Sequence, residues 1–136
     1  MCKRDHTLGW IDVTPYFPNR ITDTSSAWGL LRHDLSAKLI LVEFKNYDQQ
    51  DIGKDETNQT RNYLKDSMGK LAIMCCNKIP NDAAHRCRNT IYSEEKKVII
   101  FLTTAQVIEM IDMKDRGDDP RYFIVDSVEK FYIQHE

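Results

Sequence analysis

The sequence has 136 residues and a mass of 16.0 kDa, the size of one domain, which argues against a two-domain enzyme with its site in an interdomain cleft. Apolar residues make up 41% and charged residues 29%, as in soluble globular proteins. The net charge of −2 gives no bulk attraction for nucleic acid. Because the chain has neither a long apolar run nor a signal-peptide pattern, we expect a cytoplasmic protein that does not span a membrane.

Three short apolar runs predict strands buried on both faces, and helical spacing between them predicts connecting helices. The predicted order is a strand at 39–44, a helix within 55–68, a strand at 71–76, a helix at 81–94 and a strand at 98–102. This alternation is typical of an α/β fold with a largely parallel sheet and right-handed crossovers.

Segments on either side of this core add further elements. Upstream, residues 25–35 place Trp28, Leu31 and Leu35 on one helix face, and residues 10–17 are rich in β-forming residues, with prolines that mark an edge. Downstream, a helix capped at Thr103 or Thr104 and a last helix beginning with Asp119 and Pro120 are expected to cover the sheet.

The cysteines show no metal-binding spacing. Cys75 and Cys76 are adjacent in a predicted strand and cannot easily pair with each other, and Cys2 and Cys87 are isolated. We expect buried, reduced thiols.

Charge is spread unevenly along the chain. Residues 1–60 carry a net charge of −2, residues 61–97 carry +4 and residues 98–136 carry −4. The basic stretch follows the strand at 39–44, so the overall charge hides a positive region.

Glu43 and Lys45 place opposite charges at the end of an otherwise apolar strand. In a strand they point to the same side, at the carboxyl end of a parallel strand, where open α/β sheets bind ligands. One interpretation is a solvent-exposed ion pair. The other is a metal site, with Glu43 and the carbonyl oxygen of Phe44 as ligands and Lys45 beside the attacking water or the scissile phosphate.

A site for Mg²⁺ or Mn²⁺ needs a second carboxylate. Asp12, in the β-rich segment that we expect to lie next to the Glu43 strand, is preferred over Asp34, which falls off the apolar face of its predicted helix. Gln59 and Tyr63 follow at i and i+4 on the next helix, where a glutamine can orient a water or phosphate oxygen. A surface glutamine and a packed tyrosine explain the same pair.

The order of these residues resembles the PD-(D/E)xK nuclease superfamily, and within it the Mrr-like and RecB-like domains. The likeness consists of Asp12, E-F-K at Glu43 to Lys45, and Q-x-x-x-Y from Gln59 to Tyr63, and it covers nearly the whole chain. It implies a restriction-endonuclease-like three-layer core with a mixed, largely parallel sheet and two C-terminal helices.

The resemblance also implies a metal-dependent endonuclease that cleaves DNA in defence or repair. Asp12 and Glu43 would bind Mg²⁺, Lys45 would polarise water or steady the transition state, Gln59 would support the site, and metal-activated water would attack in line. The basic stretch would position phosphates, although some of its side chains must face away. Its candidate DNA contacts are Arg61, Lys65, Lys70, Lys78, Arg86 and Arg88.

Departures from the family pattern keep other functions open. Only 11 residues precede Asp12, although family members usually have a helix there, so we expect a shortened domain or a piece of a longer protein whose targeting lies in a partner or fused domain. A catalytically inactive module of the same fold, binding nucleic acid or mediating assembly, is the alternative. RNA as substrate and a homodimer are further possibilities that the resemblance leaves open.

Overall fold

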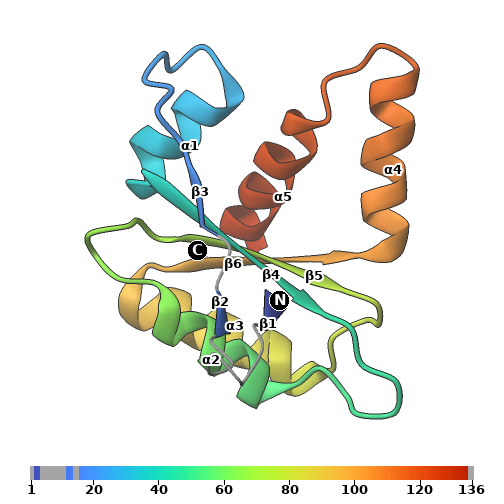
Figure 1. Ribbon diagram of the computed structural model, residues 1–136. Helices are drawn as coiled ribbons and strands as arrows, with labels where there is room; N and C mark the ends of the chain where they lie inside the picture. The colour runs from blue at the N-terminus through green and yellow to red at the C-terminus, as the bar shows by residue number, and fades with distance from the viewer. Residues whose placement is uncertain (1, 4–11, 14–15, 135–136) are drawn as a thin grey trace.

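Four strands form one mixed sheet with helices on both faces in the computed structural model (Figure 1). The structure describes residues 2–3, 12–13 and 16–134, with only the backbone of the first two ranges. Strand β3 (Tyr16–Pro18) runs antiparallel to β4 (Leu39–Lys45), and β5 (Leu71–Cys76) and β6 (Val98–Thr103) follow in parallel. The expected α/β class with a largely parallel sheet is confirmed.

The β-rich segment at 10–17 contributes to two strands rather than to one neighbour of β4. Its last residues belong to β3, whereas Asp12 lies in β2 (Asp12–Val13), which pairs with β1 (Cys2–Lys3) in a separate two-stranded sheet. Among the described residues, the expectation that the strand carrying Asp12 pairs with β4 is therefore wrong.

Helices α2 (Lys54–Tyr63) and α3 (Asp82–Glu95) cover one face of the sheet (Figure 1). Helix α2 was expected to extend toward Met68, but it ends at Tyr63 because Leu64 turns to extended backbone. The buried side chain of Leu64 joins the core from this turn instead of from the helix.

Helices α1 (Ala27–Leu35), α4 (Thr104–Asp115) and α5 (Arg121–Gln134) lie on the other face. Helix α5 buries four apolar side chains, as expected of a cover. Helix α4 has no buried residue, so the prediction that both closing helices cover the sheet is wrong for α4.

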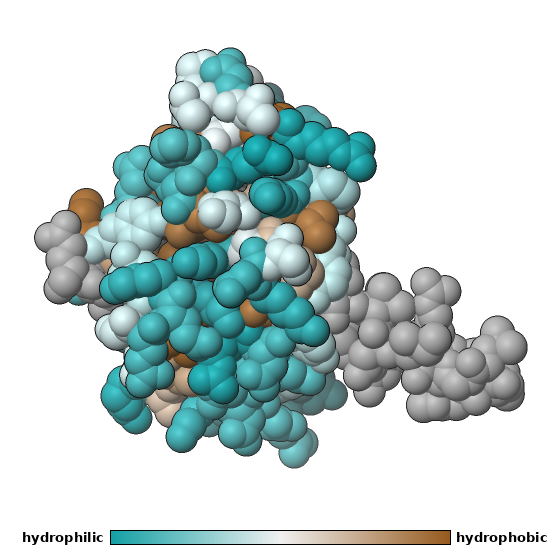
Figure 2. Space-filling model, turned by 90° about the vertical axis from the view of Figure 1, so that its left-hand side faces the viewer, coloured by the Kyte–Doolittle hydropathy of each residue, from teal (hydrophilic) through white to brown (hydrophobic). Residues whose placement is uncertain are grey.

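The apolar residues of α4 explain this difference. They are spread around its circumference, so that Val107 and Met110 are half-buried against the core while Ile108 and Ile111 are exposed. On the side of the molecule shown in Figure 2 hydrophilic residues dominate, and apolar residues show as separate patches. None of the described helices is long and apolar enough to cross a membrane.

Candidate functional site

Glu43 and Lys45 point from the end of β4 toward α2, on the same side of the sheet as Leu41. The Glu43 side chain is fully buried and that of Lys45 is 7% exposed. Lys45 Nζ lies 3.3 Å from Glu43 Oε2 and donates a hydrogen bond of 3.0 Å to Gln59 Oε1. The two charges thus form a buried pair and not a solvent-exposed strand-end ion pair.

Helix α2 presents polar residues to this pair. The Thr60 hydroxyl is 3.1 Å from Glu43 Oε2 and also 3.1 Å from the carbonyl oxygen of Glu56, so two acceptors share its one proton. Thr57 is fully buried as well and donates to the carbonyl oxygen of Gly53. The helix sequence K-D-E-T-N-Q-T-R-N-Y contains no aliphatic residue, and the charged end of β4 beneath it makes this polar inner face possible.

Glu56 of α2 and Tyr16 of β3 also form hydrogen bonds on this side of the sheet. The carboxylate of Glu56 accepts from the backbone N–H of Gly53 at 2.7 Å and from Gln50 at 3.4 Å, which caps the start of α2. The Tyr16 hydroxyl donates to the carbonyl oxygen of Tyr63 at 3.3 Å. Burial, followed by the negative charge of Glu43, raises the pKa of Tyr16.

One oxygen of Glu43 remains available to a ligand. Oε2 is held by Lys45 and Thr60, whereas Oε1 is buried without a hydrogen-bond partner among the described residues. A buried carboxylate oxygen without a donor suits a bound cation. The part of the chain that the structure describes contains no group of three His, Cys, Asp or Glu residues able to hold a metal ion.

The candidates for that second carboxylate differ in position. Asp34 is exposed on α1, across the sheet from Glu43 and close enough to Tyr132 for its charge to act on that phenol, which rules out the Asp34 alternative. The side chain of Asp12 lies outside the described residues. Because β3 is antiparallel to β4 with Tyr16 opposite Leu41, the amino end of β3 points toward the Glu43 end of β4.

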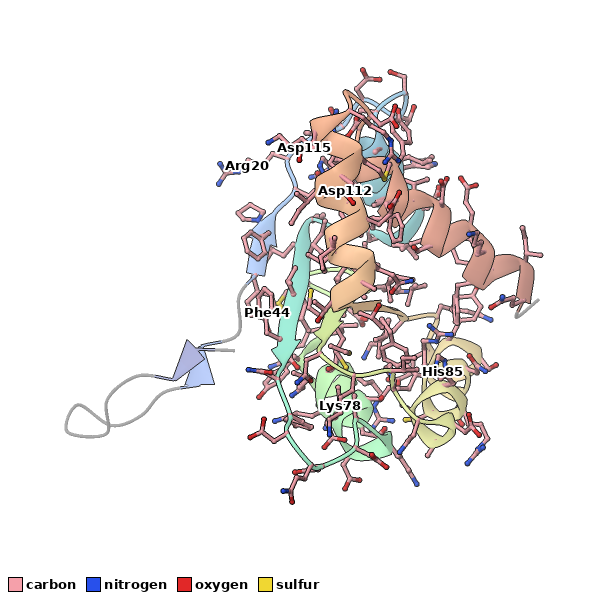
Figure 3. The ribbon with its side chains drawn as sticks, turned by 90° about the vertical axis from the view of Figure 1, so that its right-hand side faces the viewer. Arg20, Phe44, Lys78, His85, Asp112 and Asp115 are labelled. Atoms are coloured by element: carbon pink, nitrogen blue, oxygen red, sulfur yellow. The ribbon has the colours of Figure 1, made fainter. Side chains whose placement is uncertain are left out.

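Phe44, expected to offer its carbonyl oxygen, lies between Glu43 and Lys45 on β4. Its side chain points to the opposite face of the sheet and is 53% exposed. Figure 3 shows Phe44 at the β3–β4 side of the molecule. These contacts involve the side chain of Phe44 and not its carbonyl oxygen, so the role of this oxygen as a metal ligand stays a prediction.

The expected basic residues separate into groups. Arg61 and Arg86 line a groove of about 540 Å³ between α2 and α3 together with Lys54, which sequence reasoning did not single out. Arg61 Nε lies 3.7 Å from Glu95 Oε2, and Lys78 Nζ donates to the carbonyl oxygen of Gln50 in the loop before α2. Lys65 is exposed in the loop after α2, and Lys70 is half-buried just before β5.

Arg88 lies apart from these residues. Its guanidinium carbon is 4.8 Å from the ring centre of Phe101 on β6 and 4.9 Å from that of Phe131 on α5. This position is beside β6, two strands from β4, so Arg88 does not belong to the α2–α3 groove.

Cys75, Cys76 and Cys87 are free thiols, but of these three only Cys76 is buried, so the expectation of buried thiols is wrong for the half-buried Cys75 and Cys87. Burial raises the pKa of Cys76 to about 12, which keeps this thiol protonated and unreactive.

The residues that sequence reasoning missed are Thr57, Thr60, Glu56 and Tyr16. The sequence of α2 indicated the first three, because a helix without aliphatic residues that covers a sheet must turn polar side chains inward. No known protein-family model, curated protein or solved structure matches the chain. The interpretation of this site therefore rests on its own geometry.

Proposed function

We propose that this protein is a metal-dependent DNA endonuclease of the PD-(D/E)xK superfamily. The observation that carries the proposal is the buried Glu43 carboxylate, which keeps one oxygen without a partner and has the other fixed by Lys45 and Thr60. This arrangement lies at the carboxyl end of a parallel strand, where open α/β sheets bind their ligands.

The residues present fit a divalent ion if Asp12 contributes. Glu43 Oε1 and the carboxylate of Asp12 would hold Mg²⁺ or Mn²⁺, and the register of β3 supports Asp12 because Tyr16, the first residue of β3, lies opposite Leu41, two residues before Glu43. The ion would supply Lewis-acid activation of water and neutralise charge on the phosphate.

Lys45 and Gln59 have distinct tasks in this proposal. The ammonium group of Lys45 has three N–H donors, and its contacts with Glu43 and Gln59 leave one for a phosphate oxygen of the substrate. Gln59 holds the ammonium in place from α2, and is thus a positioning residue. Tyr63 supports this face of α2 by packing against the core.

The groove between α2 and α3 supports nucleic acid as the substrate. Lys54, Arg61 and Arg86 bring positive charge from two helices to one surface, and Asn58 and Thr90 add hydrogen-bonding groups. Contacts of this kind fix the position of a phosphate backbone without reading its sequence.

Plasmid cleavage with Mg²⁺ or Mn²⁺ tests the proposal. We expect Glu43→Gln and Lys45→Ala to lower the rate by roughly 10³-fold, since each removes several kcal/mol of transition-state stabilisation, and Gln59→Ala to lower it by about 10–100-fold. Glu94→Ala and Lys96→Ala, which remove the same charges from exposed positions, are matched controls. Circular dichroism confirms that each variant is folded. Full activity in both the Glu43 and the Lys45 variants would contradict the mechanism.

A non-catalytic module that binds nucleic acid is the second candidate, because no group of three His, Cys, Asp or Glu among the described residues could hold a metal ion. DNA binding without metal binding in a calorimetric titration would favour this candidate. Matched DNA and RNA substrates in the same assay distinguish the two nucleic acids.

A further inference from the structure

A pocket of about 470 Å³ lies beside β6, between α3 on one side and α4 and α5 on the other. Its basic lining residues are His85, Arg88 and Lys130, and hydroxyl and amide groups of Ser127 and Gln134 stand among them. None of its described lining residues is acidic. In Figure 3, His85 on α3 marks this side of the molecule, away from Phe44 on β4.

Arg88 is the unusual member of this lining. Its guanidinium is held between the rings of Phe101 and Phe131, and its Nε is buried without a hydrogen-bond partner. Within the described part of the chain Arg88 forms no ion pair, whereas Arg61 and Arg121 each face a carboxylate. Burial lowers the pKa of Arg88 to about 10.

A desolvated cation without a counter-charge destabilises a fold, and the two aromatic rings offset this only in part. An apolar side chain of similar length would fill the same space at less cost. The charge of Arg88 is therefore best explained by an anion that it binds.

We propose that this pocket binds the phosphate group of a nucleotide-sized ligand. The planar guanidinium of Arg88, oriented by the two rings, suits bidentate contact with a phosphate, and Lys130 adds a second positive charge. The exposed side chain of Ile79 provides an apolar wall for a planar base. The volume falls within the range of small-molecule sites.

The pocket is separate from the candidate nuclease site. It adjoins β6, whereas Glu43 lies on β4, with β5 between them. The proposal is therefore independent of the nuclease function. Two sources share its ligand chemistry: a free mononucleotide and the phosphorylated 5′ end of a nucleic-acid strand.

Calorimetric titration of the whole protein tests the proposal with four probes: deoxyadenosine monophosphate, deoxyadenosine, and an oligonucleotide with and without a 5′ phosphate. We expect a phosphorylated probe to bind at least about tenfold more tightly than its unphosphorylated counterpart. Preference for the mononucleotide identifies a free ligand, and preference for the phosphorylated oligonucleotide identifies a strand end.

Variants of the lining residues test whether the phosphorylated probe binds in this pocket. Arg88→Met should weaken it at least about tenfold and Lys130→Glu should abolish it, the latter from an exposed position of α5 that leaves the fold intact. Lys96→Ala is the control, because Lys96 also lies over an aromatic ring, Tyr92, but outside the pocket. Equal affinity for phosphorylated and unphosphorylated probes, or unchanged affinity in the Lys130 variant, would overturn the proposal.

Discussion

The buried charges at the end of β4 and the half-buried charge of Arg88 beside β6 differ in how they are balanced. Glu43 and Lys45 neutralise each other at 3.3 Å, with hydrogen bonds from Thr60 to the carboxylate and from the ammonium to Gln59. Arg88 lies against two aromatic rings. The first place is a coupled network, and the second is a single charge without a carboxylate partner among the described residues.

This difference in charge balance predicts different effects on stability when one charge is removed. In a coupled pair each charge supports the other, so removal of one leaves the other buried and unpaired. A half-buried cation without a carboxylate partner among the described residues, such as Arg88, supports no other charge, so its removal relieves a desolvation cost. Stability measurements on the two places should therefore diverge.

Lys45→Met should have the largest effect on stability. The change leaves Glu43 buried and charged without its partner, and we expect a loss of about 3–5 kcal/mol in the free energy of unfolding, measured by urea denaturation. The double variant Glu43→Gln, Lys45→Met should recover much of this loss. A single-variant loss below about 1 kcal/mol would show that the pair is not coupled as the structure has it.

Thr60→Val should have the next largest effect, since it keeps the shape of the side chain and removes a hydrogen bond to a charged group. We expect a loss of about 1.5–3 kcal/mol in the free energy of unfolding. Thr57→Val is the matched control, because Thr57 is equally buried but donates to a neutral carbonyl, and should lose about 1 kcal/mol. Equal losses in the two variants would place Thr60 outside the charge network.

Arg88→Met should change the free energy of unfolding by no more than about 1.5 kcal/mol, because the lost cation–π contacts are offset by the relief of desolvation. Deoxyadenosine monophosphate should raise the Tm of the native protein and leave that of the variant unchanged. A loss as large as that of Lys45→Met would show that Arg88 is a structural charge.

Patterns of residue type sufficed for most of the fold. The apolar runs at 71–76 and 98–102 became β5 and β6 because strands covered on both faces need continuous apolar side chains. Period-2 alternation placed Glu43 and Lys45 on one face, and helical spacing placed Gln59 within reach of Lys45. These relations depend on local geometry, which the sequence carries.

The end of α2 and the positions of the basic side chains depend on tertiary packing, which local sequence patterns do not show. Helix α2 ends at Tyr63 rather than near Met68 because the chain turns there to bury Leu64, a turn that the prediction of a helix within 55–68 did not contain. The basic stretch suggested one surface, but Arg88 faces β6 while Arg61 and Arg86 face the α2–α3 groove. Position along the sequence does not show which side of a layered fold a residue reaches.

The smallest expected effect is a pH dependence at Tyr132, next to the Phe131 ring that packs on Arg88. Burial, followed by the charges of Tyr92 and Asp34, raises the pKa of Tyr132 to about 12. In the unfolded chain the phenol loses its proton near pH 10, so the folded state binds more protons between pH 10 and 12 and stability falls as pH rises through that window. The contribution is complete below pH 10, and we expect it to be about 0.5–1 kcal/mol because the ring is partly exposed.

Tyr132→Phe has no phenol to titrate, so its denaturation midpoint should decline less between pH 9 and 11.5. Parallel curves for the two proteins would mean that the α5 side of β6 is more open to water than the structure shows, and would weaken the case for a desolvated Arg88 beside it.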